Sequence, residues 1–246
     1  MEVATELETQ GLVGRPLFWN RDREQLLNDL VGILKFDHQR EIRGTVVATE
    51  LKFGLPDGDF PPLKHTLPSG RTVNFRGSVD RVEKTRTGTL VVVDYKTGKL
   101  DSYKELSPEN PILGGSQLQL PLYAAAANSY LGEDSDETHA SYWFTSDSQK
   151  WATRGYLVSD NVLNAFDEAM DVIVDGIEGG LFPPKAAPSS SKWTGVGKCV
   201  FCDPDALGTR EIDEKWKALS LLDSLHPYTQ LRGEAAIAGA EKSDDE

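Results

Sequence analysis

The stretch LVVVDYKTGK, residues 90–99, decides the fold prediction because a run of strand-forming aliphatic residues ends in an acid and a lysine. Side chains alternate along an extended chain, so Leu90, Val92, Asp94 and Lys96 share one face of the strand. The apolar side chains of that face lead directly into a carboxylate and an ammonium group. Charges placed at the end of a buried strand predict a functional site.

The segment before this strand predicts its hairpin partner. RTVNFRGSVDRVEK (71–84) alternates between polar and apolar residues, and TRTG (85–88) is typical of a turn. Asp80 and Asp94 are about equally distant from the turn, so we expect them opposite or diagonal, with Cβ atoms roughly 5–8 Å apart. Two carboxylates at that distance repel each other unless a positive charge lies between them.

A divalent metal ion is one explanation for such a pair of carboxylates. Mg²⁺ takes oxygen ligands and is usually held by one or two carboxylates together with water and substrate phosphate. Lys96, one pleat beyond Asp94, would then face the same site, orient a water molecule and offset charge on a phosphate. The alternative is a chance Asp-x-Lys sequence at a solvated strand edge.

The remaining periodicity predicts one mixed α/β domain. We expect a helix at 21–38, a strand at 45–54, a loop at 55–70 and a helix at 111–132. The apolar residues near one stripe of the last helix are Leu118, Leu122, Tyr123, Ala126 and Tyr130. A strand pair follows at 138–146 and 151–159, then a helix at 159–180 and a short helix at 212–224. Hairpins among helices favour a mixed sheet over a regular strand–helix alternation.

Composition limits the classes of protein that fit the chain. Its 246 residues contain 39% hydrophobic and 26% charged residues, which is typical of a globular protein, and no segment is apolar enough to span a membrane. Two cysteines cannot form a disulfide framework, so we expect a reducing cytoplasm. The net charge of −13 argues against a general nucleic-acid binder, although a local groove can carry the opposite sign.

Three motifs in order resemble the PD-(D/E)xK nucleases of the RecB/AddB type. They are FRGSVDRVE (75–83), LVVVDYKTGK and QLQLPLYA (117–124). The resemblance implies a restriction-endonuclease-like α/β fold, a mixed β-sheet flanked by helices. It also implies a Mg²⁺- or Mn²⁺-dependent deoxyribonuclease, an exonuclease more than an endonuclease, that serves double-strand-break repair or recombination with a helicase.

The resemblance also assigns roles to individual residues. Asp80 and Asp94 would be the metal carboxylates, and Lys96 would be the catalytic lysine. Gln119 and Tyr123 match a Gln-x-x-x-Tyr pair that helps to position substrate DNA. Residues four apart share a helix face, so both can reach one cleft. An ordinary amphipathic helix is the alternative explanation for this pair.

Two further acids are less specific. Glu50 resembles an acid that the family often carries and is a candidate third metal ligand, but a solvated or ion-paired glutamate fits equally well. The same choice applies to Glu83. The family's N-terminal metal-binding histidine has no match here, because His38 lacks its sequence context.

The cysteines depart from the family pattern. Cys199 and Cys202 keep a C-x₂-C spacing, but Gly208 stands where a third cysteine would lie. An iron–sulfur cluster needs four thiolates, so we expect no cluster in this chain. The pair resembles a residual cluster motif, with a shared zinc as the minor alternative.

Nearby basic residues are candidates for DNA binding. Lys192 and Lys198 could line a DNA path, and Trp193 offers a stacking face, although solubilising lysines would give the same pattern. The expected organisation is a helical segment at 1–44, the nuclease domain at 45–225 and a disordered acidic tail at 226–246. The leading alternative function is a catalytically inactive nuclease-like domain that binds DNA or docks a subunit, and RNA is a further candidate substrate.

Overall fold

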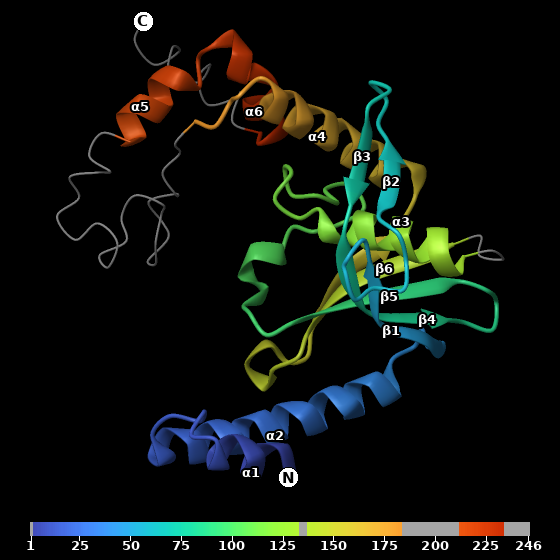
Figure 1. Cartoon of the computed structure of the whole chain (residues 1–246), viewed down its shortest axis with the longest axis vertical. Coiled ribbons are helices and arrows are strands. Elements are labelled where there is room, and N and C mark those ends of the chain that lie inside the picture. Colours follow the sequence, from blue (N-terminus) through green and yellow to red (C-terminus); the bar gives the residue numbers. More distant parts are fainter. Residues whose placement is uncertain (1, 133–136, 184–211, 234–246) are drawn as a thin grey trace, which may run out of the picture. The chain divides into compact units, whose positions relative to one another are not determined.

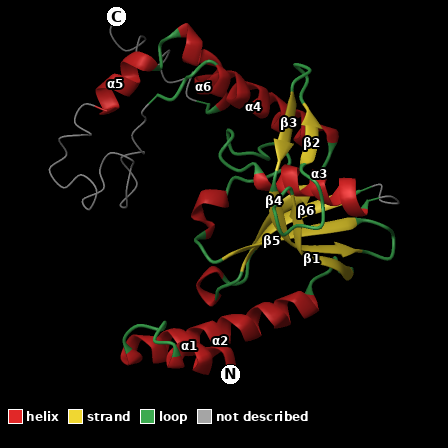
Figure 2. Ribbon diagram, in the orientation of Figure 1, coloured by secondary structure: helices red, strands yellow, loops and turns green. Residues whose placement is uncertain are grey.

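The computed structural model, which describes residues 2–132, 137–183 and 212–233, contains a five-stranded mixed sheet (Figure 1). In spatial order its strands are β1 (Thr45–Phe53), β4 (Gly77–Lys84), β5 (Leu90–Lys96), β6 (Thr138–Phe144) and β7 (Thr153–Leu157). Strands β1, β4 and β5 are antiparallel, β5 and β6 are parallel, and β6 and β7 are antiparallel. The expected mixed sheet flanked by helices is therefore confirmed (Figure 2).

A helix packs on each face of this sheet. Leu90 and Val92 belong to the main core, which includes Leu120 of helix α3 (Gln119–Leu131). Val91 and Val93 pack on the other face, against partly buried side chains of helix α2 (Pro16–Gln39). The period-two alternation expected for residues 90–96 is thus present, and it assigns the Asp94 and Lys96 side chains to the α3 face.

Helix α3 begins later than its periodicity predicted, and its packing follows the prediction only in part. It starts at Gln119, and its buried residues are Leu120, Pro121, Ala124, Ala126 and Ala127. The predicted stripe is confirmed in part: Ala126 is fully buried, and Leu122, Tyr123 and Tyr130 pack against the core as partly buried side chains. Gln119 and Tyr123 lie one turn apart on the same side of the helix, and both are partly buried.

A separate two-stranded sheet occupies part of the predicted 55–70 loop. Strand β2 (Leu63–Thr66) pairs antiparallel with β3 (Thr72–Phe75). The single strand expected at 71–84 is therefore two strands, with Arg76 between them. The break has a simple cause: β3 pairs with β2, whereas β4 pairs with β1 and β5, so the chain changes partners at Arg76.

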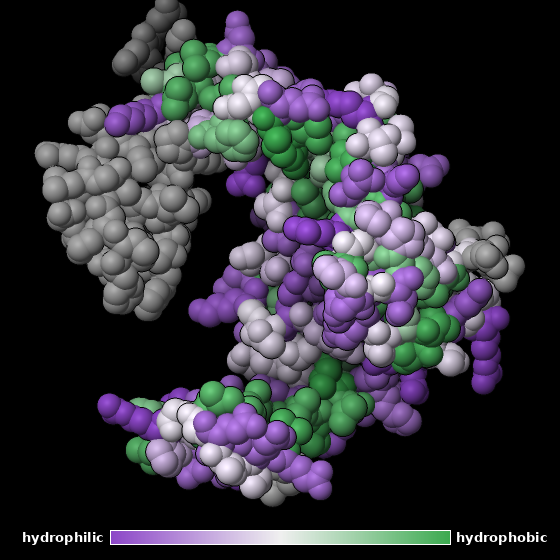
Figure 3. All heavy atoms as spheres, viewed as in Figure 1, coloured by the Kyte–Doolittle hydropathy of each residue, from purple (hydrophilic) through white to green (hydrophobic). Residues whose placement is uncertain are grey.

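The N-terminal segment is helical, as expected, and consists of α1 (Glu2–Thr9) and α2. Ile33 and Phe36 of α2 pack on the sheet, and Phe36 meets the Trp143 ring edge-on at 5.7 Å. Other apolar side chains of α2 are exposed, including Leu17 (78%) and Leu34 (67%), and Figure 3 shows apolar surface along this helix. Among the described helices, none is both long and apolar enough to cross a membrane.

The chain divides into two compact units, and the second contains most of α4 (Asp160–Glu178) with α5 (Ile212–Leu219) and α6 (His226–Leu231). Within it, Arg71 pairs with Asp171 at 2.8 Å and with Asp175 at 2.5 Å, which joins the β2–β3 turn to α4. Leu225 and Thr229 are buried. The expected disorder from residue 226 was therefore wrong for the α6 segment, while residues 234–246 lie outside the described part.

Candidate active site

Strand β5 carries the two charged residues that the sequence singled out. Its parallel neighbour β6 pairs with it as far as Lys96, where the register partner is Phe144. The antiparallel ladder with β4 ends earlier, at Arg81 and Val93. Residues 94–96 therefore pair with β6 on one side, while on the β4 side their backbone groups are available for hydrogen bonds with side chains.

Asp94 is the buried carboxylate of the site, with 4% of its surface exposed. Its Oδ2 atom lies 2.5 Å from Lys96 Nζ in an ion pair, yet among the described residues this buried atom receives no well-directed hydrogen bond. Burial raises the pKa of Asp94, the Lys96 ammonium counters that shift, and the nearby Asp80 carboxylate adds to it. Asp94 is therefore an incompletely satisfied acid beside a second acid.

Asp80 reaches the same place from β4. If the β4–β5 register were extended by one residue beyond Arg81 and Val93, Asp80 would stand opposite Asp94. Here the Tyr95 N–H donates a 2.7 Å hydrogen bond to Asp80 Oδ2 in place of a backbone carbonyl of β4. The contact holds the carboxylate at the end of β5.

Lys96 is held by three different groups. Besides its ion pair with Asp94, its Nζ donates a 2.9 Å hydrogen bond to Gln119 Oε1 and lies 5.0 Å from the centre of the Tyr142 ring. A cation above an aromatic face is attracted by the ring quadrupole. The ammonium is therefore positioned rather than free to sample its rotamers.

Helix α3 supplies the polar pair of the site. Gln119 Nε2 donates to the Tyr123 hydroxyl at 3.3 Å, so the amide bridges Tyr123 and Lys96. Burial raises the pKa of Tyr123, the Gln119 hydrogen bond lowers it, and the Asp94 carboxylate raises it again. The net shift is upward, so the phenol keeps its proton at neutral pH and can donate it in a hydrogen bond.

Tyr142 belongs to the site although sequence reasoning missed it. It is fully buried, its register partner is Asp94, and its hydroxyl donates to Gln117 Oε1 at 3.4 Å. The Tyr103 ring packs against it edge-on at 4.8 Å. Alternation within the 138–146 strand was the available signal, but only the parallel pairing with β5 identifies which face Tyr142 occupies.

Glu50 lies in β1 without a demonstrated link to the acid pair. It is exposed, adopts a left-handed backbone conformation (φ 50°) and accepts a 3.1 Å hydrogen bond from Ser78 Oγ. In the part of the chain that the structure describes, no three His, Cys, Asp or Glu side chains are grouped as metal ligands would be. The structure thus gathers Asp80, Asp94 and Lys96, and it does not place Glu50 in a three-ligand group with the two aspartates.

Glu83 occupies the opposite face of the sheet. It is completely buried, forms ion pairs with Arg40 and Arg81, and accepts a 2.9 Å hydrogen bond from Gly44 N–H. Of the alternatives raised for this acid, the ion-paired one is correct. His38 is exposed at the end of α2.

The remaining candidates fall outside the described residues. These are Lys192, Trp193, Lys198, Cys199 and Cys202. Their expected roles in DNA binding and as a residual cysteine motif stay predictions.

The donor set fits a hard divalent cation. Asp94 offers a buried carboxylate oxygen that lacks a directed hydrogen bond, and the adjacent Asp80 carboxylate supplies a second oxygen donor. Oxygen donors of this kind suit Mg²⁺ or Mn²⁺, which need few protein ligands when water and phosphate complete the coordination. Asp80 and Asp94 are the residues that would hold such an ion.

Fold and site together define a class of protein. Residues 2–236 match the PD-(D/E)XK nuclease superfamily, which is nearly the whole chain. The chain belongs to this superfamily, and the resemblance in its three motifs is confirmed.

Its curated relatives are much longer proteins, each named as a subunit of an ATP-dependent helicase/deoxyribonuclease. The one from Clostridium tetani is 45% identical over 82 residues, which are 32% of this chain and 7% of the relative. The protein of the same name from Desulforudis audaxviator is 32% identical over 130 residues, 51% of this chain and 11% of the relative. The chain thus matches about a tenth or less of the length of these relatives.

Proposed function

We propose that this chain is a Mg²⁺- or Mn²⁺-dependent deoxyribonuclease of the RecB/AddB type, which hydrolyses DNA phosphodiester bonds. The observation that supports this most directly is the Asp94 carboxylate, buried beside Asp80 with one oxygen that lacks a directed hydrogen bond. A folded protein keeps a buried acid in this state at a cost in stability, which is typical of functional sites. Membership of the nuclease superfamily supports the same reaction class.

The roles of the chain's own residues follow from their contacts. Asp80 and Asp94 would hold the ion, which when bound would supply Lewis-acid polarisation of a phosphoryl oxygen. Lys96, held by Gln119, would orient the attacking water and offset negative charge that develops on the phosphate. The protonated Tyr123 would donate to the phosphodiester and position the strand.

The wider context is also part of the proposal. The names of the relatives favour a helicase partner and a DNA substrate. The resemblance in the three motifs further implies linear or single-stranded DNA ends and a role in double-strand-break repair or recombination. We expect exonuclease rather than endonuclease activity, and the cysteine content favours a cytoplasmic location. Circular and linear substrates distinguish the two modes, because an exonuclease leaves closed circles intact.

The test compares degradation of linear single- and double-stranded DNA, and of matched RNA, by the wild type, Asp94→Ala and Lys96→Ala with Mg²⁺ or Mn²⁺. We expect both variants to lose at least about a hundredfold in rate, roughly 2.7 kcal/mol of transition-state stabilisation. A folded wild type that cleaves no DNA, or variants as active as the wild type, would contradict the proposal.

A second candidate is a catalytically inactive nuclease-like domain that binds DNA or docks a subunit. It is favoured by one observation: the described residues group two carboxylates, Asp80 and Asp94, but no three ligand side chains. Calorimetric titration with Mn²⁺ separates the two candidates. Affinity that disappears in Asp80→Ala and Asp94→Ala supports the nuclease, whereas a wild type that binds no Mn²⁺ supports the inactive domain.

A further inference from the structure

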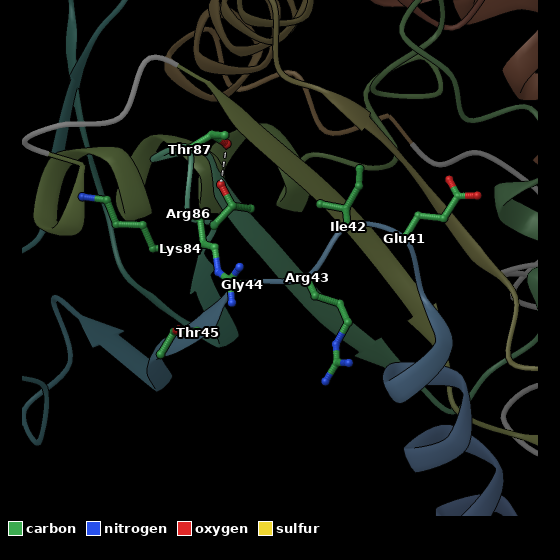
Figure 4. Close-up of a pocket in the computed structure, with 9 residues that line it drawn as sticks. Glu41, Ile42, Arg43, Gly44, Thr45, Lys84, Arg86 and Thr87 are labelled. Atoms are coloured by element: carbon green, nitrogen blue, oxygen red, sulfur yellow. Dashed lines mark hydrogen bonds between the residues drawn. The ribbon is translucent and has the colours of Figure 1, made fainter.

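A cavity of about 650 Å³ lies where the α2–β1 linker meets the β4–β5 turn. Its lining residues are Glu41, Ile42, Arg43, Gly44, Thr45, Lys84, Thr85, Arg86 and Thr87 (Figure 4). Three of these residues are basic and one is acidic, in a chain whose formal net charge is −13. Figure 4 shows the Glu41 carboxylate turned away from Arg43 and Arg86.

The basic groups come from two segments that are about forty residues apart, so a local sequence pattern cannot reveal their proximity. Arg43 lies in the linker, Lys84 ends β4, and Arg86 lies in the turn. The turn also presents hydroxyl groups: Thr85 and Thr87 hydrogen-bond through their Oγ1 atoms at 2.9 Å. Guanidinium, ammonium and hydroxyl groups are the side-chain donors that contact phosphate oxygens of nucleic acids.

The cavity wall is anchored by the buried acid of the opposite face. Glu83 accepts a hydrogen bond from Gly44 N–H and pairs with Arg40, so both ends of the short linker are tied to β4. Gly44 itself approaches β4 so closely that an added Cβ would lie 2.6 Å from the Lys84 carbonyl oxygen. The linker that carries Arg43 is therefore fixed against the strand, and the exposed Arg43 guanidinium donates a 3.1 Å hydrogen bond to the His38 carbonyl.

The cavity, called the groove below, lies at one end of the β4–β5 pair, and the acid pair Asp80 and Asp94 lies at the other end. Lys84 is four residues from Asp80 on β4, and its register partner Leu90 is four residues from Asp94 on β5. At about 3.3 Å per residue the separation is roughly 13 Å. One strand of a duplex advances about 3.4 Å per nucleotide, so this distance corresponds to about four nucleotide steps.

We propose that the cavity lined by Arg43, Lys84 and Arg86 binds backbone phosphates of the nucleic-acid strand, a few nucleotides from the scissile bond. This inference rests on the proposed nuclease function, because the strand that occupies the groove is the substrate. The groove offers basic side chains to the charged backbone, and its remaining lining is both polar and apolar and includes Ile42. It therefore contributes affinity without sequence preference.

The test measures binding of a fluorescein-labelled oligothymidylate of about 16 nucleotides by anisotropy, in EDTA and over a series of salt concentrations. The variant Arg43→Gln/Arg86→Gln removes two charges from the groove, and Lys35→Gln/Lys64→Gln removes two exposed charges elsewhere. Each phosphate contact contributes roughly 0.7 to the slope of log K against log salt for single strands, so the groove variant should lose roughly 1.4 from the slope. The control variant should keep the wild-type slope.

Each other outcome decides the question as well. A groove variant with the slope of the control would overturn the inference, provided that both unfold at the wild-type temperature. Inorganic phosphate at constant ionic strength should compete with the groove-dependent binding, because both ligands present phosphate oxygens, and binding that phosphate does not displace would overturn the phosphate assignment. If the groove variant binds like the wild type and cleavage still depends on Asp94, the groove assignment is wrong and the nuclease function stands. Groove-dependent binding without any cleavage would overturn the nuclease function instead.

Discussion

The Lys96 ammonium donates a 2.9 Å hydrogen bond to Gln119 Oε1, which joins the end of β5 to the first residue of α3. Gln119→Ala removes this acceptor and the bridge to Tyr123 while leaving the ion pair with Asp94. A hydrogen bond to a charged group contributes about 1.5–3 kcal/mol. We therefore expect the cleavage rate to fall about 10- to 150-fold, measured as kcat on linear DNA.

The control for this prediction is Gln39→Ala, which truncates an exposed glutamine at the end of α2. It should cleave at the wild-type rate. A wild-type kcat in Gln119→Ala would show that Lys96 is positioned sufficiently by Asp94 and the Tyr142 ring, and the role assigned to Gln119 would be wrong.

Metal binding should appear as a change in stability that depends on Asp94. Burial and the Asp80 charge raise the pKa of Asp94, so the ionised carboxylate destabilises the fold at pH values above that pKa. Without metal, Asp94→Asn should unfold at a higher temperature than the wild type. Mn²⁺ at about 100 times its Kd should stabilise the wild type by about 2.7 kcal/mol, or several degrees, and leave the variant unchanged.

Glu50→Gln provides the matched comparison in the same melting experiment. A Mn²⁺-induced shift equal to that of the wild type would exclude Glu50 as a ligand, whereas a reduced shift would support its predicted role. A shift that persists in Asp94→Asn would place the metal elsewhere and contradict the assignment of Asp94.

The acid pair and its lysine were predictable because their signal is local. Alternation fixes the face of Asp94 and Lys96 relative to Val92, and the turn position fixes the distance of Asp80 from the hairpin end. The structure adds what these rules do not contain, since the Asp80 carboxylate accepts the Tyr95 N–H in place of a backbone carbonyl. Such an exchange depends on where the ladder between β4 and β5 stops.

Long-range pairings explain what the sequence did not reveal. Tyr142 reaches Lys96 only through the parallel register of β5 and β6, and the cavity at the β4–β5 turn combines Arg43 with residues more than forty positions later. The packing of α3 was predicted only in part for a related reason: hydropathy favours leucines at 118 and 122 over alanines as fully buried residues. Close approach to the sheet selects Ala124 and Ala127 instead, because small side chains let the helix backbone lie near the strands.

The buried ion-pair network between α2 and the sheet should make stability depend on pH. Burial alone would raise the pKa of Asp37, but hydrogen bonds from Arg40 and Arg81 hold it below its ordinary value. A carboxyl group whose pKa is lower in the folded protein stabilises the fold fully at pH values above its pKa in the unfolded chain, near 3.9. This stabilisation is lost as the pH falls through the pKa in the folded protein. Asp37→Asn should therefore show a smaller drop in unfolding free energy below pH 4 than the wild type.

Urea titrations at several pH values between about 2.5 and 6 measure this difference. Asp22→Asn, at an exposed aspartate of the same helix that pairs only with the exposed Arg21 in the described contacts, should retain the wild-type pH dependence. If Asp37→Asn and the wild type lose stability in parallel, the network is not the origin of the acid sensitivity.

Helix α2 depends on a glycine for its contact with the corner after β6. The Trp151 ring packs so closely that a Cβ at Gly32 would lie 2.0 Å from it, and Trp151 is held by a left-handed backbone (φ 50°) and a 3.3 Å hydrogen bond to the Asp29 carbonyl. Gly32→Ala should therefore destabilise the protein by about 1–3 kcal/mol, as overpacking does, despite the higher helix propensity of alanine.

Gly176→Ala in α4 is the matched control, since nothing lies within 4 Å of its added Cβ. It should be neutral or stabilising by up to about 1 kcal/mol, because only the helix propensity changes. The double variant Gly32→Ala/Trp151→Ala removes the ring that the new methyl group meets, so it should be more stable than the sum of the two single effects. Additive losses in chemical denaturation would mean that the ring and Gly32 do not compete for the same space.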